Sequence, residues 1–248
     1  MVNWKEHRLA ELAEIVMGQS PKGDTCNDDG EGVPLLNGPT EFGSSHPDPV
    51  QFTIDPKKFA EPLDILFCVR GSTTGRMNWA NQTYAIGRGI AAIRHRKGSK
   101  YRHFIKGLIE YNLETLLRSA TGSTFPNVSR DQLNNLVVKA PETNTQESIS
   151  EILASIDDII ELNNQINKNL EALAQALFKQ WFIDFEFPNE NGRPYKSNGG
   201  EMVESELGMI PKRWKVGEIN DIGVNIRKGI NPRGTWRVFS NRLKVEIF

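Results

Sequence analysis

Hydrophobic residues recur every seven positions between Gln146 and Phe182. One column is Ile149, Ile156, Asn163, Leu170 and Leu177, and the column three residues later is Ile152, Ile159, Ile166, Leu173 and Gln180. Eight of these ten positions, called the seam below, are aliphatic, and no Gly or Pro interrupts the run. This pattern is typical of a coiled-coil helix, which at about 1.5 Å per residue would be roughly 55 Å long. The sequence offers no second helix of that length, so we expect the seam to pair with another chain.

Short apolar runs separated by Gly- and Pro-rich loops precede this helix. The pattern predicts a strand or helix over 4–16, buried strands over 64–70 and 85–94, a helix over 101–117 and a last strand over 133–138. The long helix should begin near a cap at Thr143 or Thr145. We therefore expect an α+β fold, in which a loop-rich mixed α/β domain is followed by a long helix of coiled-coil type.

The opening motif returns near the end of the chain. Trp4-Lys5-x-x-x-Leu9-x-x-Leu12 reappears as Trp214-Lys215-x-x-x-Ile219-x-x-Ile222, and Pro21-Lys22-Gly23 reappears as Pro232-Arg233-Gly234. A repeat this long indicates a duplicated unit of domain plus helix. We expect a domain at 1–142, the helix at 143–185, a linker at 186–210, and the start of a second domain at 211–248 that stops after about one loop.

Composition narrows the class of protein. The chain is 38% hydrophobic and 25% charged, as globular proteins are. Cys26 and Cys68 have no partner spacing that would indicate a disulfide framework or a zinc site. The N-terminus lacks the apolar core of a signal peptide, and no run of 18 apolar residues occurs, so we expect a cytoplasmic protein without a membrane span.

Charge is distributed unevenly along a chain whose net charge is −1. Residues 65–109 contain no Asp or Glu but nine cations: Arg70, Arg76, Arg88, Arg94, Arg96, Lys97, Lys100, Arg102 and Lys106. We interpret this basic window as a face presented to a polyanion. The alternative is a solvated face that happens to lack acidic residues.

No catalytic motif accompanies these features. The sequence lacks a phosphate-binding loop, a zinc-protease motif, a nucleophile elbow and the motifs of a methyltransferase. The four histidines have no metal-ligand spacing, and we expect His95 and His103 to contact phosphate or solvent. We therefore expect neither an enzyme nor a cofactor or metal site.

Three polar loops carry the chemistry that remains. The segment Arg70 to Arg76 places two guanidinium groups around three hydroxyls, and residues 18–22 and 121–127 are built from similar turn-forming residues. Arg can read guanine edges, whereas hydroxyl groups bind phosphate oxygens. The candidate DNA-binding residues are Gln19, Ser20, Lys22, Arg70, Ser72, Thr73, Thr74, Arg76, Arg88, Arg94, Arg96, Ser123, Thr124 and Asn127. Taken singly, each loop is better explained as an ordinary turn, but three such loops beside a cationic strand favour a nucleic-acid face.

Asn163 lies in the middle of the first seam column. A lone Asn in such a seam costs stability but fixes register and choice of partner. The alternative is a helix that bends or loosens there, because Asn164 adjoins it.

These motifs together resemble the specificity subunit of type I restriction–modification systems. The resemblance rests on Trp4-Lys5-x-x-x-Leu9, Gly122-Ser123-Thr124-Phe125-Pro126-Asn127-Val128-Ser129 and Pro141-x-x-x-x-Gln146-x-x-Ile149. It continues in Gln180-Trp181-Phe182-x-Asp184-Phe185 and Glu206-Leu207-Gly208-Met209-Ile210-Pro211-x-x-Trp214. It implies target recognition domains that each read half of a split DNA target, antiparallel spacer helices, and no catalytic activity of their own.

The hypothesis from sequence is a half-specificity subunit that forms a homodimer through the long helix. Its expected partners are double-stranded DNA and the modification (methyltransferase) and restriction subunits. The rival is a non-catalytic coiled-coil scaffold protein without sequence-specific DNA binding.

Overall fold

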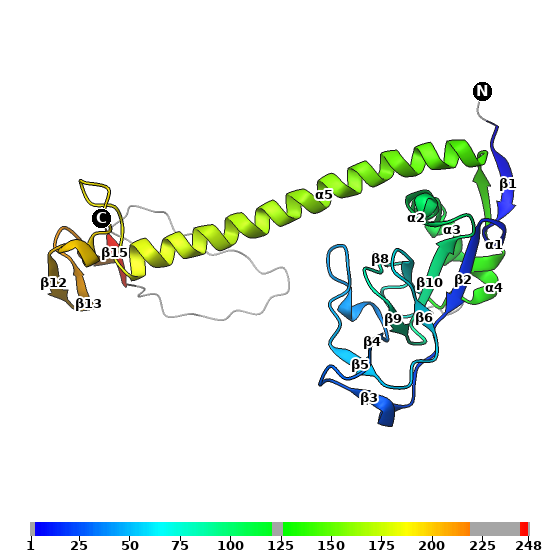
Figure 1. Cartoon of the computed structure of the whole chain (residues 1–248), viewed down its shortest axis with the longest axis horizontal. Helices are drawn as coiled ribbons and strands as arrows, with labels where there is room; N and C mark the ends of the chain where they lie inside the picture. The colour runs from blue at the N-terminus through cyan, green and yellow to red at the C-terminus, as the bar shows by residue number, and fades with distance from the viewer. Residues whose placement is uncertain (1–2, 121–125, 219–243, 248) are drawn as a thin grey trace, which may run out of the picture. The chain divides into compact units, whose positions relative to one another are not determined.

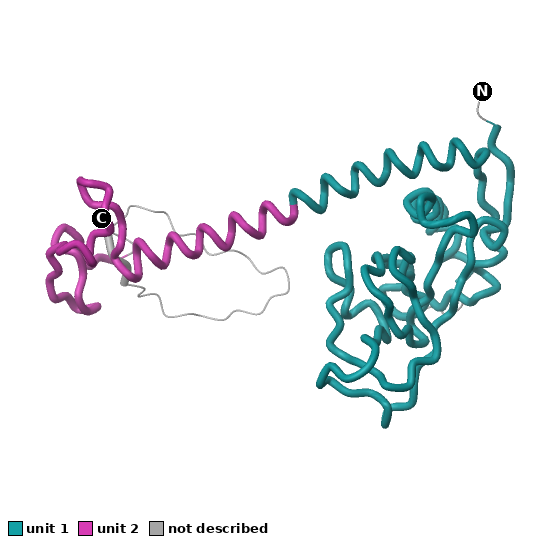
Figure 2. Tube along the Cα trace, in the orientation of Figure 1, with its two compact units in different colours: residues 1–163 teal, residues 164–248 magenta. Residues whose placement is uncertain are grey.

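The computed structural model describes residues 3–120, 126–218 and 244–247 of the chain. They fall into two compact units, residues 1–163 and 164–248 (Figure 2). The mixture of helices and sheets, with one long helix, confirms the predicted fold class. Each unit is described separately below.

A four-stranded antiparallel sheet lies at the centre of the first unit. Its strand order is β2 (Ala13–Met17), β10 (Ile90–His95), β7 (Ile65–Cys68) and β8 (Met77–Trp79). Successive side chains of a strand point to opposite faces. Accordingly Ile65 and Phe67 join one hydrophobic core, and Leu66 between them joins the other. The sheet is thus covered on both faces, which explains why residues 65–69 of the strand predicted at 64–70 are all apolar.

A five-stranded sheet contributes to the second core. Its order is β3 (Cys26–Asn27), β5 (Gln51–Thr53), β4 (Val33–Leu36), β9 (Tyr84–Ile86) and β6 (Phe59–Ala60), in which β4 and β9 are parallel. Leu36, Tyr84 and Ile86 from this sheet pack with Leu66 and Ala92 of the central sheet.

Helices contribute to the first core (Figure 1). They are α1 (Leu9–Leu12), α2 (Arg102–Tyr111), α3 (Leu113–Arg118) and α4 (Arg130–Asn134), together with a two-stranded ribbon of β1 (Lys5–Arg8) and β11 (Val137–Ala140). Leu9, Phe104, Ile105 and Leu133 are buried in this layer. The segment 4–16, left open between strand and helix, contains both.

Three predicted elements differ from those observed. The single strand expected over 85–94 is two strands in different sheets, because Gly87-Arg88-Gly89 turns the chain between β9 and β10. The helix expected over 101–117 breaks at Asn112. The strand expected from Leu133 begins instead as helix α4, because Ser129 and Gln132 form a capping box.

The long helix α5 (Thr143–Phe178) begins within the first unit, so Thr143 and Thr145 both lie inside it rather than before it. Its first turns are anchored by buried polar groups. Gln146 accepts a hydrogen bond from His95 Nε2 (3.1 Å) and donates one to the Pro141 carbonyl (2.8 Å). Ser150 donates to the Lys100 carbonyl at 2.7 Å. Gln146 and Ser150 are the buried residues of the described helix, so its attachment to the domain is concentrated in the first turns.

The second unit is built around aromatic residues. A π-helical turn (Lys179–Ile183) ends the long helix, and Trp214 packs against Phe182, Phe185 and Phe187. Hairpin strands β12 (Met202–Ser205) and β13 (Gly208–Pro211) precede β14 (Lys215–Glu218), which pairs with β15 (Lys244–Ile247). Strands β1 and β14 both begin at the Lys that follows the repeated Trp. The repeated positions 219–243 lie outside the described residues.

The segment expected to be a linker carries a network of its own. Asn189 Oδ1 accepts hydrogen bonds from the Asn191 and Arg193 backbone N–H groups, at 2.9 and 3.1 Å. Tyr195 stacks on Phe187 and donates to the Glu201 carbonyl at 2.9 Å. Its Pro, Gly and Asn residues therefore form defined turns packed against the aromatic cluster.

Replacing Gln146 by Ala should lower the free energy of unfolding by about 2 kcal/mol, because His95 and the Pro141 carbonyl would lose their buried partner. Urea denaturation followed by circular dichroism measures the loss. Glu151→Ala, an exposed truncation on the same helix, is the control and should leave the unfolding free energy nearly unchanged. Equal losses in the two variants would contradict the anchoring role.

Candidate nucleic-acid interface

Two predicted loops meet where the two sheets approach each other. The backbone N–H groups of Gly18 and Gln19 donate to the carbonyls of Ile90 and Ile86, at 2.9 and 2.8 Å. The hydroxyl of Ser20 accepts from the Arg88 N–H at 3.2 Å. A Cβ on Gly18 would lie 2.1 Å from the Gly87 carbonyl oxygen, so only glycine permits this approach. Residues 18–22 are therefore packed against the turn that carries Arg88.

The loop after β7 is joined to the same turn. The Val69 N–H donates to the Gly89 carbonyl at 2.9 Å, and the Val128 N–H donates to the Val69 carbonyl at 2.8 Å. Arg70 and Asn127 form a β-bridge, and the Thr74 hydroxyl donates to the Pro126 carbonyl at 2.8 Å. Residues 18–22, 70–74, 87–89 and 126–128 thus form one surface, called the loop face below.

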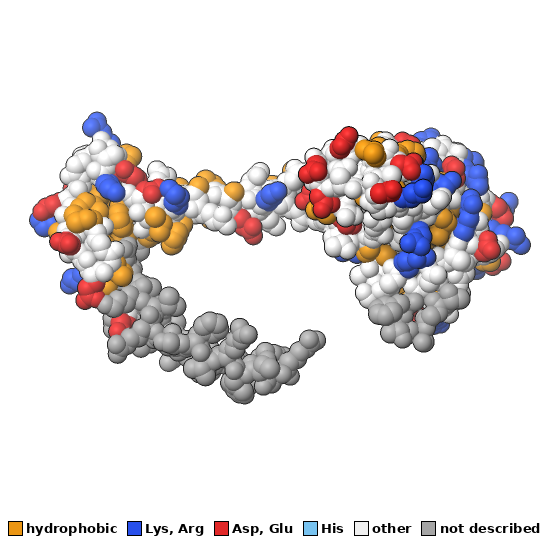
Figure 3. Space-filling model, turned by 90° about the horizontal axis from the view of Figure 1, so that it is seen from below, with side chains coloured by type: hydrophobic (Ala, Val, Ile, Leu, Met, Phe, Trp, Pro, Cys, Tyr) orange, Lys and Arg blue, Asp and Glu red, His pale blue; other side chains and the backbone are white. Residues whose placement is uncertain are grey.

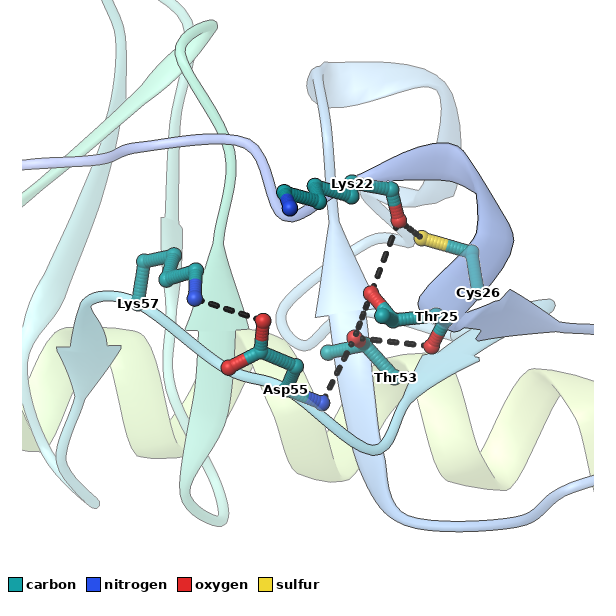
Figure 4. Close-up of polar contacts among 6 residues, drawn as sticks. All are labelled: Lys22, Thr25, Cys26, Thr53, Asp55 and Lys57. Carbon is teal, nitrogen blue, oxygen red and sulfur yellow. Dashed lines mark hydrogen bonds and ion pairs between the residues drawn. The ribbon is translucent and has the colours of Figure 1, made fainter.

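Three cations of the loop face have free side chains. Lys22, Arg70 and Arg88 are exposed, and their side chains make no hydrogen bond or ion pair with any residue that the structure describes. The backbone of Lys22 is held in place by two hydrogen bonds. Its carbonyl accepts one from the hydroxyl of Thr25 at 2.7 Å and one from the thiol of Cys26 at 3.4 Å (Figure 4). Thr53 in turn donates to the Thr25 carbonyl at 3.1 Å. A free cation on an ordered backbone is suited to binding an external anion or a base edge.

Other predicted cations are held within the protein. Arg76 donates to the carbonyls of Phe42 (2.8 Å) and Pro39 (3.3 Å). Arg94 pairs with Asp64 at 2.6 Å, and burial raises the pKa of that carboxyl although Arg94 acts against the rise. The guanidinium of Arg96 donates to the Ala10 carbonyl at 2.7 Å. The structure therefore gives these three guanidinium groups intramolecular roles, and Arg76 does not form the expected pair with Arg70 around the hydroxyl loop.

The remaining predicted DNA-binding residues differ in their surroundings. Gln19, Ser72, Thr73 and Asn127 are exposed on the loop face, whereas the Thr74 hydroxyl bonds to the Gly71 and Pro126 carbonyls. Ser123 and Thr124 lie outside the described residues.

Asn37 is a neighbour that the sequence reasoning missed. Its side chain accepts from Ser20 at 3.4 Å and donates to Gln51 at 3.2 Å. The Asn37-Gly38 dipeptide is a turn signal in the sequence, but nothing local to it indicates contact with Ser20.

Several side chains in the second half of the basic window contact helix α5. Lys97 donates to the Thr143 hydroxyl at 2.6 Å, and Lys100 pairs with Glu147 at 2.6 Å. His95 and His103 are buried, in contact with Gln146 and Asp157 of the same helix. The expectation that these histidines meet phosphate or solvent was wrong, because their partners come from a segment some 50 residues later in the chain.

Most of the seam is exposed in the single chain. Ile152, Ile156, Ile159, Ile166, Leu170, Leu173 and Leu177 all present apolar surface to solvent, and Figure 3 shows hydrophobic side chains along the rod. Ile149 differs, because it is half-buried against the core of its own domain. The free part of the seam therefore begins at Ile152.

Within residues 3–120, 126–218 and 244–247, the helices lack an apolar stretch of the length that a membrane span needs, and no cluster of His, Cys, Asp or Glu side chains could hold a metal ion.

Comparisons with known proteins match most of the chain. The profile of the type I restriction modification DNA specificity domain matches residues 1–172. The MjaX type I restriction enzyme specificity subunit of Methanocaldococcus jannaschii is 34% identical over 158 residues, which are 64% of this chain and 37% of the relative.

Solved structures show the same fold. The HsdS subunit of Thermoanaerobacter tengcongensis has a TM-score of 0.54 and 31% identity, over 72% of this chain and 44% of that one. The type I restriction–modification S subunit from M. genitalium has a TM-score of 0.56 at 18% identity, over 74% and 47%, and supports the fold alone. The chain thus spans less than half the length of each of these proteins.

Stability should fall as the pH drops below about 6.5, the ordinary pKa of His. Burial lowers the pKa of His95, and burial with the Arg102 charge lowers that of His103, against the opposing Asp157. The unfolded chain therefore binds protons at higher pH than the folded one, and stability is lost as pH falls through that window. Urea denaturation between pH 7 and 5 measures the slope, which His95→Gln should reduce. The same change at exposed His46 is the control; equal slopes for all three proteins would contradict the prediction.

Proposed function

Because the chain belongs to the family of type I restriction–modification DNA specificity domains, we propose that it is a DNA specificity subunit that reads one half of a bipartite target. Residues 1–142 form the target recognition domain and residues 143–185 the spacer helix. Residues 186–210 connect this helix to the start of a second recognition domain at 211–248.

The free cations on the loop face carry this proposal. Arg70 and Arg88 are exposed on neighbouring turns joined by the Val69–Gly89 backbone hydrogen bond, and neither pairs with an acid that the structure describes. A guanidinium group can donate to O6 and N7 of guanine in the major groove, and each such contact discriminates against a wrong base by about 1–3 kcal/mol. The exposed side chains of Lys22, Ser72 and Thr73 suit phosphate contacts, which position the duplex without reading its sequence.

The exposed seam supports homodimerisation through the long helix. A continuous apolar stripe of this length is stabilised by burial against a second helix. A two-fold pair of antiparallel helices would present two identical loop faces, so the preferred duplex would contain two inverted copies of one half-site. The helix length would then set the gap between the copies.

The proposed subunit acts without catalysis of its own. Its partners are double-stranded DNA and the methyltransferase and restriction subunits, which would supply the chemistry. The same seam would also serve a scaffold protein that lacks sequence-specific DNA binding. That rival predicts binding to random and selected duplexes with equal affinity in the presence of the partner subunits.

Arg88→Ala should relax base choice at one position of the half-site by about 1–3 kcal/mol. Competition binding with duplexes that each carry one base change measures the discrimination. Arg118→Ala removes another exposed arginine, which pairs with Glu114 outside the loop face, and is the control. Uniform weakening on every duplex with a flatter salt dependence would assign Arg88 to phosphate and overturn its reading role. Equal effects of the two changes would count against the loop face itself.

Asn163→Leu should tighten self-association while reducing its selectivity for register, because the seam would lose its one central polar residue. Sedimentation equilibrium over a concentration series measures the dissociation constant. Asn164→Leu makes the same change one position off the seam and should have little effect. Weaker association of the Asn163 variant would place that residue outside the paired surface.

A further inference from the structure

An apolar groove of about 750 Å³ lies beside the start of helix α5. Tyr111 of α2, Val137 of β11 and Trp4 form its exposed wall, with 88%, 57% and 49% of their surfaces accessible. Phe104 and Leu108 also line it. Apolar side chains this exposed and this close together are typical of a surface that another protein segment covers.

Charge in the groove argues against nucleic acid as its occupant. Glu6 and Lys139 are the charged residues of its lining, and they are cross-strand partners in the β1–β11 ribbon. The groove therefore carries one charge of each sign, unlike the loop face, where the free side chains are cationic.

The groove continues the seam. Ile149 and Leu153 of α5 line it together with Tyr111 and Val137. Ile149 belongs to the first seam column, and Leu153, four residues later, flanks the seam on one side. A helix paired along the free seam would therefore reach the groove at its end, on the side that Leu153 marks.

The heptad register determines which residues of a paired helix lie next to the groove. An antiparallel pair that uses the whole seam places Ile152 opposite the partner's Leu177 and Ile156 opposite the partner's Leu173. Trp181 follows Leu177 by four residues, in the π-helical turn Lys179–Ile183 that ends the helix, so it lies one turn beyond the last aliphatic residue of the seam. The partner's Trp181 thus comes level with the first turns of α5, next to the groove.

The chain contains a template for this kind of contact. Trp214, the repeat counterpart of Trp4, is only 8% exposed because Phe182, Phe185 and Phe187 surround it. The segment that packs against Trp214 thus begins with Phe182 in the last turn of the long helix and continues just past that helix to Phe187. Phe178, Trp181 and Ile183 of that helix end remain exposed.

We propose that the groove beside Trp4 receives the helix end of a second copy of the chain, with the partner's Phe178 and Trp181 against Tyr111 and Val137. The contact rests on the proposed homodimer and extends it. It adds an aromatic anchor at each end of the helix pair and thereby favours the register that uses the full seam.

A double-mutant cycle on the full-length chain tests the contact, with the dimer dissociation constant measured by sedimentation equilibrium. Tyr111→Ala and Trp181→Ala should each raise the dissociation constant about tenfold. The double variant should raise it by much less than the product of the two, because the rings contact each other. Ile54→Ala truncates an exposed apolar side chain outside the groove; it is the control and should have no effect.

The outcomes separate this inference from the homodimer and from DNA reading. The groove contact would be overturned if the dimer were stable and Tyr111→Ala left its dissociation constant unchanged. It would also be overturned if the effects of Tyr111→Ala and Trp181→Ala on the dissociation constant were strictly multiplicative. Either result would still be consistent with the helix pair. A monomer at micromolar concentrations would overturn both. DNA discrimination by Arg88 is measured independently of either result.

Discussion

The attachment of helix α5 to its own domain is the constraint on which the proposed function depends. Gln146 and Ser150 are buried polar residues at the start of the helix, and each has partners on the segment 95–104 or on Pro141. An unpaired polar group at such a depth would cost more than the bond contributes, so the helix cannot rotate or slide without penalty. Lys100 with Glu147 adds a contact at the helix start, and Ser45 with Glu161 adds one farther along the helix. A spacer can set a distance only if its origin is fixed in this way.

The same attachment explains how the positive charge is shared. The acid-free window supplies cations to two surfaces: Lys97 and Lys100 to the start of α5, and Arg70 and Arg88 to the loop face. Between them, Arg76, Arg94 and Arg96 hold loops and strands together. The basic window is uniform in the sequence, but the strands and turns of the fold distribute its cations between different surfaces.

Features that depend on neighbouring residues in the sequence could be predicted, whereas contacts between distant segments could not. The run at Ile65–Cys68 and the heptads of α5 are periodic patterns, and both elements were predicted. The turn at Gly87-Arg88-Gly89 was not predicted, because apolar residues continue on both sides of it. Its two glycines are nevertheless a turn signal in the sequence. Ser129 and Gln132 also formed a readable capping box before Leu133. The partners of Arg76, Arg94, His95 and His103 were beyond reach, because each is a side chain or carbonyl brought from at least 30 residues away.

The central claim is that two identical loop faces are held at a fixed separation by paired helices. Selection of bound duplexes from a random pool, with the methyltransferase subunit present, tests it most directly. The account predicts enrichment of two inverted copies of one half-site separated by a constant gap. Enrichment of one uninterrupted site, of copies at variable spacing, or of no sequence at all would contradict it.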